Sequence, residues 1–533
     1  MSKKYDAVII GGGHNGLVCA AYLARAGKSV LVLERRYILG GATVTEEIYP
    51  GFKFSVCSYV VSLMRPRIIS ELDLPRFGFE LLPLDGSLTP LLDGNYLMRW
   101  HDAAETRKEL ARFSHLDAEA YERFGKLMYH LAMAVRPMLS TTPPDPTSLS
   151  PKNLAALADL GKTFGKSDDY LYDLAKLMTM SSADFVEEWF ESEPLRGSLA
   201  ASGIIGTFLG PRSPGSAYVM LHHYMGEIDG QFRSWGLPRG GMGGVTDSIA
   251  GAARSFGAEL RTEAPIDHIL IERGKACGVV LEGGEEIRAD KVVSSVDPKR
   301  TFLQMVGRDH LDPEFVKQIE RYKIRGSSGK VNLALDALPH LACLEGIEAK
   351  TGYAEESYLR GALSISPSID YLERAYQDAK YGRFSRRPYM DIVIPTLADP
   401  AMAPPGKHVM SIFVQYAPYE LAEGTWEEQR EPFGDAVIDT LAEYIPNLKD
   451  IILYRQVVTP WDLEQTMGMT QGNIFHGELS LEQLFFLRPA AGWADYTTPI
   501  KNLFQCGSGT HPGGGVMGAP GRLAAQKILA VER

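Results

Sequence analysis

The stretch Tyr5-Asp6-Ala7-Val8-Ile9-Ile10-Gly11-Gly12-Gly13-His14-Asn15-Gly16 decides the fold of this chain. Its apolar run is typical of a buried strand and ends in the spacing Gly-x-Gly-x-x-Gly. A helical pattern follows, and a second strand-like run over residues 29–34 ends in an acid. This order predicts a βαβ unit that binds a dinucleotide, because the glycines let the backbone approach a pyrophosphate and the acid binds a ribose hydroxyl. The predicted binding residues of this unit are Gly11, Gly13, His14, Asn15, Gly16 and Glu34.

The residues after Glu34 distinguish FAD from NAD. Arg35 leads to a second pair of glycines, which gives the backbone a second close approach to the pyrophosphate. Together with the βαβ unit, this segment looks like the extended FAD-binding pattern of the flavoproteins that include amine oxidases and carotenoid desaturases. We therefore expect FAD as the cofactor, with further binding residues at Arg35, Gly40, Gly41, Ala42 and Thr43. Many relatives carry an arginine at the position of Ala42, and its loss argues against an amine oxidase.

The spacing Gly-x-Gly-x-x-Gly recurs at residues 513–518, where it has a different role. Only one helix, expected over residues 522–531, fits after it, so no second strand or ribose acid follows. The N-terminal amides of that helix favour negative charge, as on the edge of a reduced flavin. This segment resembles the C-terminal signature of carotenoid desaturases, which implies that Gly507, Ser508, Gly515, Val516 and Met517 hold the isoalloxazine ring.

A third glycine cluster, at residues 237–244, leads into a helix expected over residues 245–256. Strand-like runs follow at residues 266–272, 278–281 and 291–296. The order resembles the return of the chain into the FAD domain of phytoene desaturase-like proteins. The resemblance implies that Ile266 lies against the adenine; an ordinary packing unit is the alternative.

The segment over residues 459–489 is similar to the phytoene dehydrogenase-like FAD-dependent oxidoreductases, and the similarity runs from residue 4 to residue 529. Within that family the chain resembles most the group of pyridine nucleotide-disulfide oxidoreductase domain-containing proteins. A disulfide oxidoreductase needs a pair of redox cysteines, whereas Cys19 and Cys57 are isolated in the sequence.

The predicted fold class is α/β, with a Rossmann-type FAD-binding domain assembled from discontinuous segments and a mixed sheet-and-helix substrate domain. The FAD-binding domain is expected at residues 1–75, 230–305 and 490–533, and the substrate or cap domain at residues 76–229 and 306–489. Amphipathic helices are expected there over residues 118–135 and 170–190, and strands over residues 330–335, 390–395 and 408–415.

Composition narrows the function classes. The chain has 533 residues, 45% of them hydrophobic, and a formal net charge of −11, so nucleic acid is not an expected partner. Its five cysteines include no C-x-x-C pair and its histidines show no metal-ligand spacing, so neither a disulfide framework nor a metal site is expected. No signal peptide or membrane-spanning segment is expected, and we expect a cytoplasmic protein, with peripheral membrane contact left open.

The expected chemistry is that of the flavin: hydride passes between a substrate C–H bond and N5, while the protein supplies position and excludes water. The expected substrate is small and apolar, with isoprenoid or carotenoid-like compounds as one class, and the electron acceptor is left open between oxygen, a quinone and another acceptor. His511 is the candidate catalytic side chain, and a hydrogen-bonded loop histidine is the alternative. Aromatic and methionine residues between positions 178 and 235 are interpreted as core first, and as a tunnel lining second.

Two other functions stay open. One is a flavin-dependent isomerase without net redox change. The other is a non-enzymatic protein like the GDP-dissociation inhibitors, which resemble this architecture without FAD; the intact glycines and Glu34 argue against it.

Overall fold

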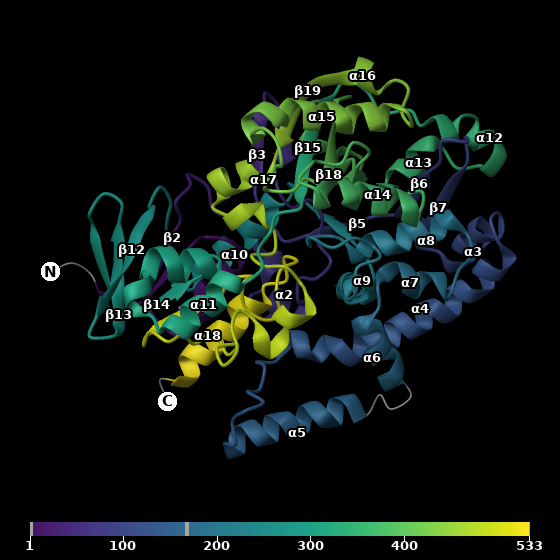
Figure 1. Cartoon of the computed structure of the whole chain (residues 1–533). Helices are drawn as coiled ribbons and strands as arrows, with labels where there is room; N and C mark the ends of the chain where they lie inside the picture. Colours follow the sequence, from purple (N-terminus) through teal and green to yellow (C-terminus); the bar gives the residue numbers. More distant parts are fainter. Residues whose placement is uncertain (1–3, 166–169, 532–533) are drawn as a thin grey trace.

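The computed structural model describes residues 4–165 and 170–531, and two large sheets organise it (Figure 1). The first sheet has the order β11-β2-β1-β14-β13-β12, with β20 beside β14. Pairs among β11, β2, β1, β14 and β20 are parallel, and β12, β13 and β14 form an antiparallel meander. Its strands are β1 (Tyr5–Ile10), β2 (Val30–Leu33), β11 (Glu259–Arg261), β12 (Ile266–Glu272), β13 (Lys275–Leu281), β14 (Glu286–Ser294) and β20 (Leu503–Gln505). Three distant parts of the chain thus build one Rossmann-type sheet, which confirms the predicted fold class.

Three helices pack together beside this sheet: α1 (His14–Arg25), α10 (Gly243–Ser255) and α18 (Ala519–Val531). Small residues let them approach closely. A Cβ at Gly521 of α18 would lie 2.1 Å from the carbonyl oxygen of Asn15 in α1. The N-terminal helix α1 and the C-terminal helix α18 therefore meet at their first turns, next to both of the Gly-x-Gly-x-x-Gly segments.

The second sheet has the order β19-β15-β18-β17-β16-β6-β7, antiparallel except for the parallel pair β16–β6. Strand β15 is buried along its whole length and lies between β19 and β18 in the sheet. The helix α15 packs close to β19 at one edge of the sheet. The bounds are β6 (Gly86–Pro90), β7 (Tyr96–Trp100), β15 (Ser328–Leu335), β16 (Ala362–Ile365), β17 (Tyr389–Val393), β18 (His408–Gln415), β19 (Ile452–Val458) and α15 (Trp426–Ala442).

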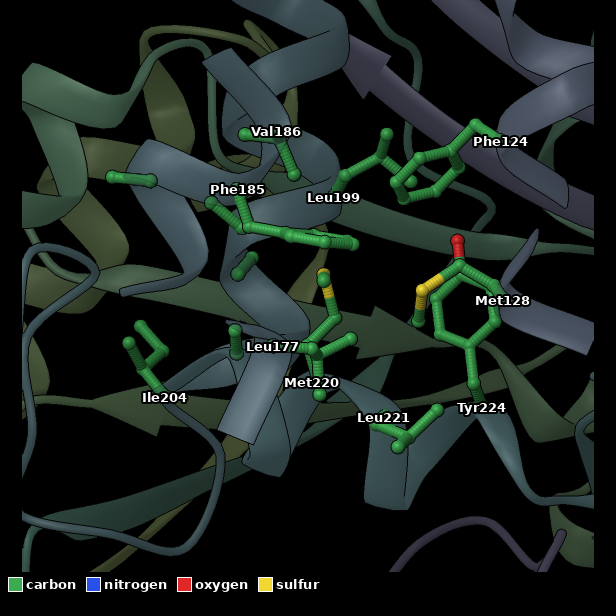
Figure 2. Close-up of a cluster of buried hydrophobic side chains, with 14 of the residues drawn as sticks. Phe124, Met128, Leu177, Phe185, Val186, Leu199, Ile204, Met220, Leu221 and Tyr224 are labelled. Atoms are coloured by element: carbon green, nitrogen blue, oxygen red, sulfur yellow. The ribbon is translucent and has the colours of Figure 1, made fainter. Parts of the chain in front are cut away.

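A group of helices between residues 103 and 224 packs around a hydrophobic core that also takes in residues of the second sheet, and Figure 2 shows Phe124, Phe185 and Met220 within it. Phe185 and Met225 are among the residues interpreted above as core first and as tunnel lining second. Both belong to this core. One prediction is wrong here: residues 170–190 form two helices, because Ser181 caps the second through its hydroxyl. The helices are α3 (Ala103–Ala111), α4 (His115–Val135), α5 (Pro151–Gly165), α6 (Leu171–Thr179), α7 (Ser182–Glu187), α8 (Glu193–Ala200) and α9 (Ser216–Tyr224).

Short elements connect the two large parts. Strand β5 (Leu81–Pro83) pairs with β10 (Gly236–Pro238), so a segment assigned above to the cap domain shares a small sheet with one assigned to the FAD-binding domain. The hairpin of β8 (Glu227–Ile228) and β9 (Gln231–Phe232) spans the boundary predicted at residue 230. The remaining elements include β3 (Thr45–Tyr49), β4 (Phe52–Ser55), α2 (Pro66–Glu71), α11 (Pro313–Arg321), α12 (Ile347–Thr351), α13 (Glu355–Leu359), α14 (Ile369–Lys380), α16 (Leu448–Ile451) and α17 (Pro460–Asp462).

None of the helices within residues 4–165 and 170–531 is long and apolar enough to cross a bilayer. The same residues hold no group of three or more potential metal ligands. The thiols of Cys19 and Cys506, far apart in the sequence, contact each other in the core of the first sheet, and their hydrogen bond together with burial raises the pKa of Cys19.

Candidate functional site

Two glycine turns lie against each other at the carboxyl end of β1. Gly40 donates its N–H to the carbonyl oxygen of Gly12 at 2.9 Å, and Gly13 forms a bridge with Gly40. A Cβ at Gly16 would lie 2.3 Å from the carbonyl oxygen of Gly11, so only glycine fits there. The carboxylate of Glu34 accepts the N–H of Gly12 at 2.8 Å, so the acid lies at the same turn. These features form the cradle that a pyrophosphate needs.

The C-terminal glycine segment joins this cradle. The side chain of Asn15 donates to the hydroxyl of Ser508 at 3.0 Å. A Cβ at Gly507 would lie 2.3 Å from the carbonyl oxygen of Ser295, just after β14. Val516 has a φ of +54°, a left-handed conformation that β-branched residues rarely adopt and that is associated with functional sites. The structure thus brings together the two segments that the sequence assigned to opposite ends of one cofactor.

Unsatisfied polar atoms mark the junction. The Nε2 atom of His14 and the Oδ1 atom of Asn15 are buried and have no hydrogen-bond partner within the described residues. Burial, with a smaller contribution from His476, lowers the pKa of His14 to about 4, so its ring is neutral at pH 7. Buried polar atoms of this kind are normally satisfied by a ligand or by water. The cradle and these free atoms fit FAD.

The other predicted residues surround the cradle in different ways. The hydroxyl of Thr43 donates to the carbonyl oxygen of Gly40 at 2.8 Å, so it supports the second turn. The guanidinium of Arg35 reaches the carbonyl oxygen of Thr466 at 2.9 Å. Ile266 begins β12, two residues after Ala264, whose N–H donates to the carbonyl oxygen of Glu34 at 2.9 Å. The start of β12 therefore lies beside Glu34, as the adenine assignment requires.

Arg300 is a cation that sequence reasoning missed. It lies with Arg35 around Gly468, since a Cβ at Gly468 would be 3.2 Å from Nη1 of Arg35 and 3.7 Å from Cζ of Arg300. Its Nε atom is buried without a partner among the described residues. It therefore places a second guanidinium near the cradle, although Ala42 itself carries no charge. The sequence around Arg300 gave no signal that this residue lies near the cradle.

His511 does not take the catalytic place expected for it. Its Nε2 atom lies 2.8 Å from the carbonyl oxygen of Met138, and its ring packs edge-on against Phe485. It is not among the residues that line the cavity described below. Burial lowers the pKa of His511 to about 4. The geometry supports the alternative stated with the prediction, a hydrogen-bonded loop histidine, because its ring is already engaged.

A cavity of about 430 Å³ opens beside the two glycine segments. On the side of the cradle it is lined by His14, Ala42, Ser508, Gly515 and Val516. Apolar and aromatic side chains continue the lining: Val60, Leu63, Ile205, Phe232, Trp235, Phe413, Ile474 and Phe475. Phe232 and Trp235 therefore belong to the tunnel lining that the sequence left as an alternative to core.

One face of the second sheet forms the floor of this cavity. Lys330, Phe413 and Asp391 are cross-strand neighbours on β15, β18 and β17. Ser87 and Arg99 are neighbours on β6 and β7, nearer the other edge. All five line the cavity, as expected for side chains that project from one face of a pleated sheet.

Lys330, Tyr59 and Asp391 form a polar group on that floor. The ammonium of Lys330 donates to the carbonyl oxygens of Ser55, Cys57 and Ser58, and burial lowers its pKa to about 7. Tyr59 donates its hydroxyl to Asp391 at 2.6 Å. Burial raises the pKa of Asp391 to about 6, although the Tyr59 hydrogen bond and the charge of Arg99 oppose the shift. At positions 330 and 391 the sequence places a single charged residue inside an apolar strand pattern. Sequence reasoning did not use this signal.

Comparison with known proteins agrees with this geometry. Residues 16–529 match the model of a family described as flavin containing amine oxidoreductase. The chain belongs to this family. It is therefore an FAD-dependent oxidoreductase, and FAD is its cofactor.

Individual relatives cover the whole chain. The chain is 41% identical to the pyridine nucleotide-disulfide oxidoreductase domain-containing protein 2 of Rattus norvegicus, over 99% of this chain and 94% of that protein. It is 26% identical to a limonene dehydrogenase component of Castellaniella defragrans, with the same coverage of 99% and 94%. Among solved structures, an oxidoreductase from Methanosarcina mazei shares the fold, with a TM-score of 0.60, 19% identity and coverage of 98% and 99%. The resemblance drawn from the sequence is thus confirmed at the level of family and fold.

Proposed function

We propose that this flavoprotein dehydrogenates an apolar substrate held in the cavity between the two glycine segments and the second sheet. The observation that carries the proposal is the continuity of the site: the residues assigned to the flavin ring and a mostly apolar lining border one cavity. Apolar enclosed sites bind apolar ligands and exclude water from a hydride transfer. The similarity to the limonene dehydrogenase component supports an isoprenoid-like substrate class.

The charges in the cavity disfavour an amine substrate. Its lining contains the basic side chains Lys330, Arg99 and Arg233, of which burial lowers the pKa of Lys330 to about 7, whereas Asp391 is the carboxylate among the described lining residues. The pKa of Asp391, raised to about 6, leaves its carboxylate mostly ionised at pH 7, but it is one negative charge against the two guanidinium charges of Arg99 and Arg233. An ammonium substrate would therefore meet net repulsion in a poorly solvated site.

When bound, FAD supplies hydride acceptance at N5, and the chain supplies position and a place for the proton. Glu34 and the glycine turns would hold the dinucleotide part, and Ser508, Gly515 and Val516 would hold the ring. Loss of a hydride and of a neighbouring proton turns a C–C single bond of the substrate into a double bond. Asp391 accepts that proton, and Tyr59, hydrogen-bonded to its carboxylate, stabilises the anion beforehand.

We further propose that oxygen or a quinone takes the electrons from the reduced cofactor. The described part of the chain contains one sheet of the Rossmann type, and we assign the cradle on it to FAD. Stopped-flow reoxidation of the reduced protein tests this point. Reoxidation by oxygen or by a soluble quinone supports the proposal, and reoxidation only by a nicotinamide nucleotide contradicts it.

The test of the proposed function is anaerobic reduction of the bound flavin. The purified holoprotein is mixed with terpenoid, carotenoid, fatty acyl and amine compounds, and flavin absorbance is followed. Stoichiometric bleaching by an apolar compound, but not by amines, supports the proposal. Conversion of a compound with flavin left oxidised would indicate an isomerase. A protein purified without flavin would revive the non-enzymatic alternative.

A further inference from the structure

The cavity lining includes a cluster of two arginines and two tyrosines, here called the arginine end. Arg99 comes from β7, Arg233 directly follows β9, Tyr121 comes from α4 and Tyr224 ends α9. All four line the same cavity as the residues assigned to the flavin ring. Four separate elements thus direct hydrogen-bond donors to one place.

The contacts within the arginine end hold the guanidinium groups in position. Nη1 of Arg233 donates to the hydroxyl of Tyr121 at 3.0 Å, and its Cζ atom lies 4.3 Å from the ring centre of Tyr224. Nη2 of Arg99 donates to the hydroxyl of Ser87 at 3.3 Å. Burial opposes ionisation of Tyr121, but the charges of Arg233 and Arg99 outweigh it and lower the pKa to about 8. Both guanidinium charges therefore favour the ionised form of the Tyr121 hydroxyl.

Neither guanidinium forms a direct ion pair within the described residues, although the charge of Arg99 acts on the Asp391 carboxylate on the floor of the same cavity. Among residues 4–165 and 170–531, no carboxylate oxygen lies within 4.0 Å of either guanidinium. The Nε atom of Arg99 and the hydroxyl of Tyr224 are buried and unpartnered within the same residues. Tyr224 is only 3% exposed. Unpaired charge and unsatisfied donors in a poorly solvated site are costly, and such a group normally serves a ligand.

The backbone of Arg233 adds an independent observation. Its φ is +61°, in the left-handed region that non-glycine residues seldom adopt. Glycine stands nearby at position 230, but the left-handed conformation at position 233 is borne by an arginine. Strain of this kind persists where the surrounding structure fixes a side chain for function.

We propose that the arginine end binds the carboxylate of the substrate, so that the substrate is an apolar chain or ring system carrying a terminal carboxylate. This inference rests on the proposed function and names its substrate class. A carboxylate fits because a guanidinium offers two parallel N–H donors to its two oxygens. The apolar body of the substrate then extends along Phe232 and Trp235 towards Ser508 and Val516, and its reacting carbons are set by the distance from the head group.

The test compares three probes with one alkyl chain and different head groups: dodecanoate, dodecanol and dodecyl phosphate. Binding to the flavin-loaded protein is measured by isothermal titration calorimetry. We expect dodecanoate to bind about tenfold or more tightly than dodecanol. We expect R99Q and R233Q to weaken dodecanoate about ten- to a hundredfold and to leave dodecanol unchanged. Equal affinity for acid and alcohol, no binding of dodecanoate, or tighter binding of dodecyl phosphate overturns the proposal.

Two further variants separate binding from folding. Y224F removes a hydroxyl that has no partner among the described residues and keeps the ring beside Arg233, so it should weaken dodecanoate a few-fold without lowering the Tm. R239Q, on an exposed arginine paired with Glu80 outside the cavity, should leave the affinity for dodecanoate unchanged. A loss of affinity in R239Q equal to that in R99Q would contradict a local site.

The outcome is separable from that of the proposed function. Selective, arginine-dependent binding of dodecanoate without flavin reduction by any apolar acid supports the head-group site and counts against the dehydrogenase. Reduction by neutral apolar compounds, at the same rate in R99Q, supports the dehydrogenase and overturns the carboxylate site.

Discussion

Asn15 and Ser508 are 493 residues apart in the chain and are joined by a hydrogen bond of 3.0 Å. This bond links the first turn of α1 to the loop between β20 and α18, and both segments border the same cavity. The cofactor site is therefore completed only when the C-terminal segment returns to the N-terminal unit.

Replacing Ser508 by alanine tests this link. S508A leaves the amide of Asn15 without its acceptor in a buried place, so we expect a loss of about 1–2 kcal/mol in stability and a lower flavin content after gel filtration. S70A, at an exposed serine, is the control and should behave as the wild type. Full flavin retention in S508A, at an unchanged Tm, would speak against the link.

The glycine cradle makes a steric prediction. G16A places a methyl group 2.3 Å from the carbonyl oxygen of Gly11, so the turn has to move and FAD should be lost. G125A is the matched control, since a Cβ in α4 at that position meets nothing within 4 Å and alanine favours helix. Flavin content is read from the absorbance spectrum. Stoichiometric FAD in G16A would refute the assignment of the cradle.

His511 should matter for stability and not for chemistry. H511Q loses the ring that bonds Met138 and packs on Phe485, and we expect destabilisation of about 1–3 kcal/mol. The rate of flavin reduction by a bound substrate should stay within about twofold of the wild type, because the ring does not line the cavity. A hundredfold slower reduction in H511Q would restore the catalytic role expected from the sequence.

Asp391 gives the reaction a pH dependence. Its carboxylate accepts a proton only when ionised, and its pKa is raised to about 6, so reduction should accelerate from pH 5 to pH 7 with a midpoint near 6. D391N should abolish this rise and reduce the rate. The measurement is stopped-flow reduction across this range, and a flat profile in the wild type would exclude Asp391 as the proton acceptor.

The raised pKa of Asp391 also predicts that D391N is more stable than the wild type. The folded protein binds the Asp391 proton more tightly than the unfolded chain, so this group lowers stability as pH rises from about 4 to about 6. At pH 7 the ionised carboxylate lowers the stability of the fold the most. D391N keeps a hydrogen-bond acceptor for Tyr59 and removes the charge. A higher Tm for D391N than for the wild type at pH 7, with a smaller difference at pH 4, is expected.

The sequence predicted the cofactor half of the molecule well, for a local reason. The boundaries of β1 and β12 were predicted to the residue, and for β1 the reason is that a short buried strand followed by glycine leaves few alternatives. The helix expected over residues 245–256 runs from Gly243 to Ser255. The single helix expected over residues 170–190 failed because a serine cap at position 181 outweighs continuous apolar periodicity.

The substrate half was largely out of reach. Lys330, Asp391 and Arg99 come from strands whose order in the sheet does not follow their order in the chain. The face of the strand on which each of these side chains lies depends on the strand order and on the register. Local residue spacing determines neither of them. His511 shows the opposite case: its position in a glycine-rich motif suggested chemistry, whereas its ring bonds a backbone carbonyl, as the alternative interpretation expects.

The most direct test of the account is a crystal structure of the protein with its flavin. We predict the isoalloxazine ring in contact with Ser508 and Val516, with the cavity containing Lys330 and Asp391 on its open side. A ring bound elsewhere, or a cavity separated from it by protein, would contradict the assignment of the cavity as the place of reaction.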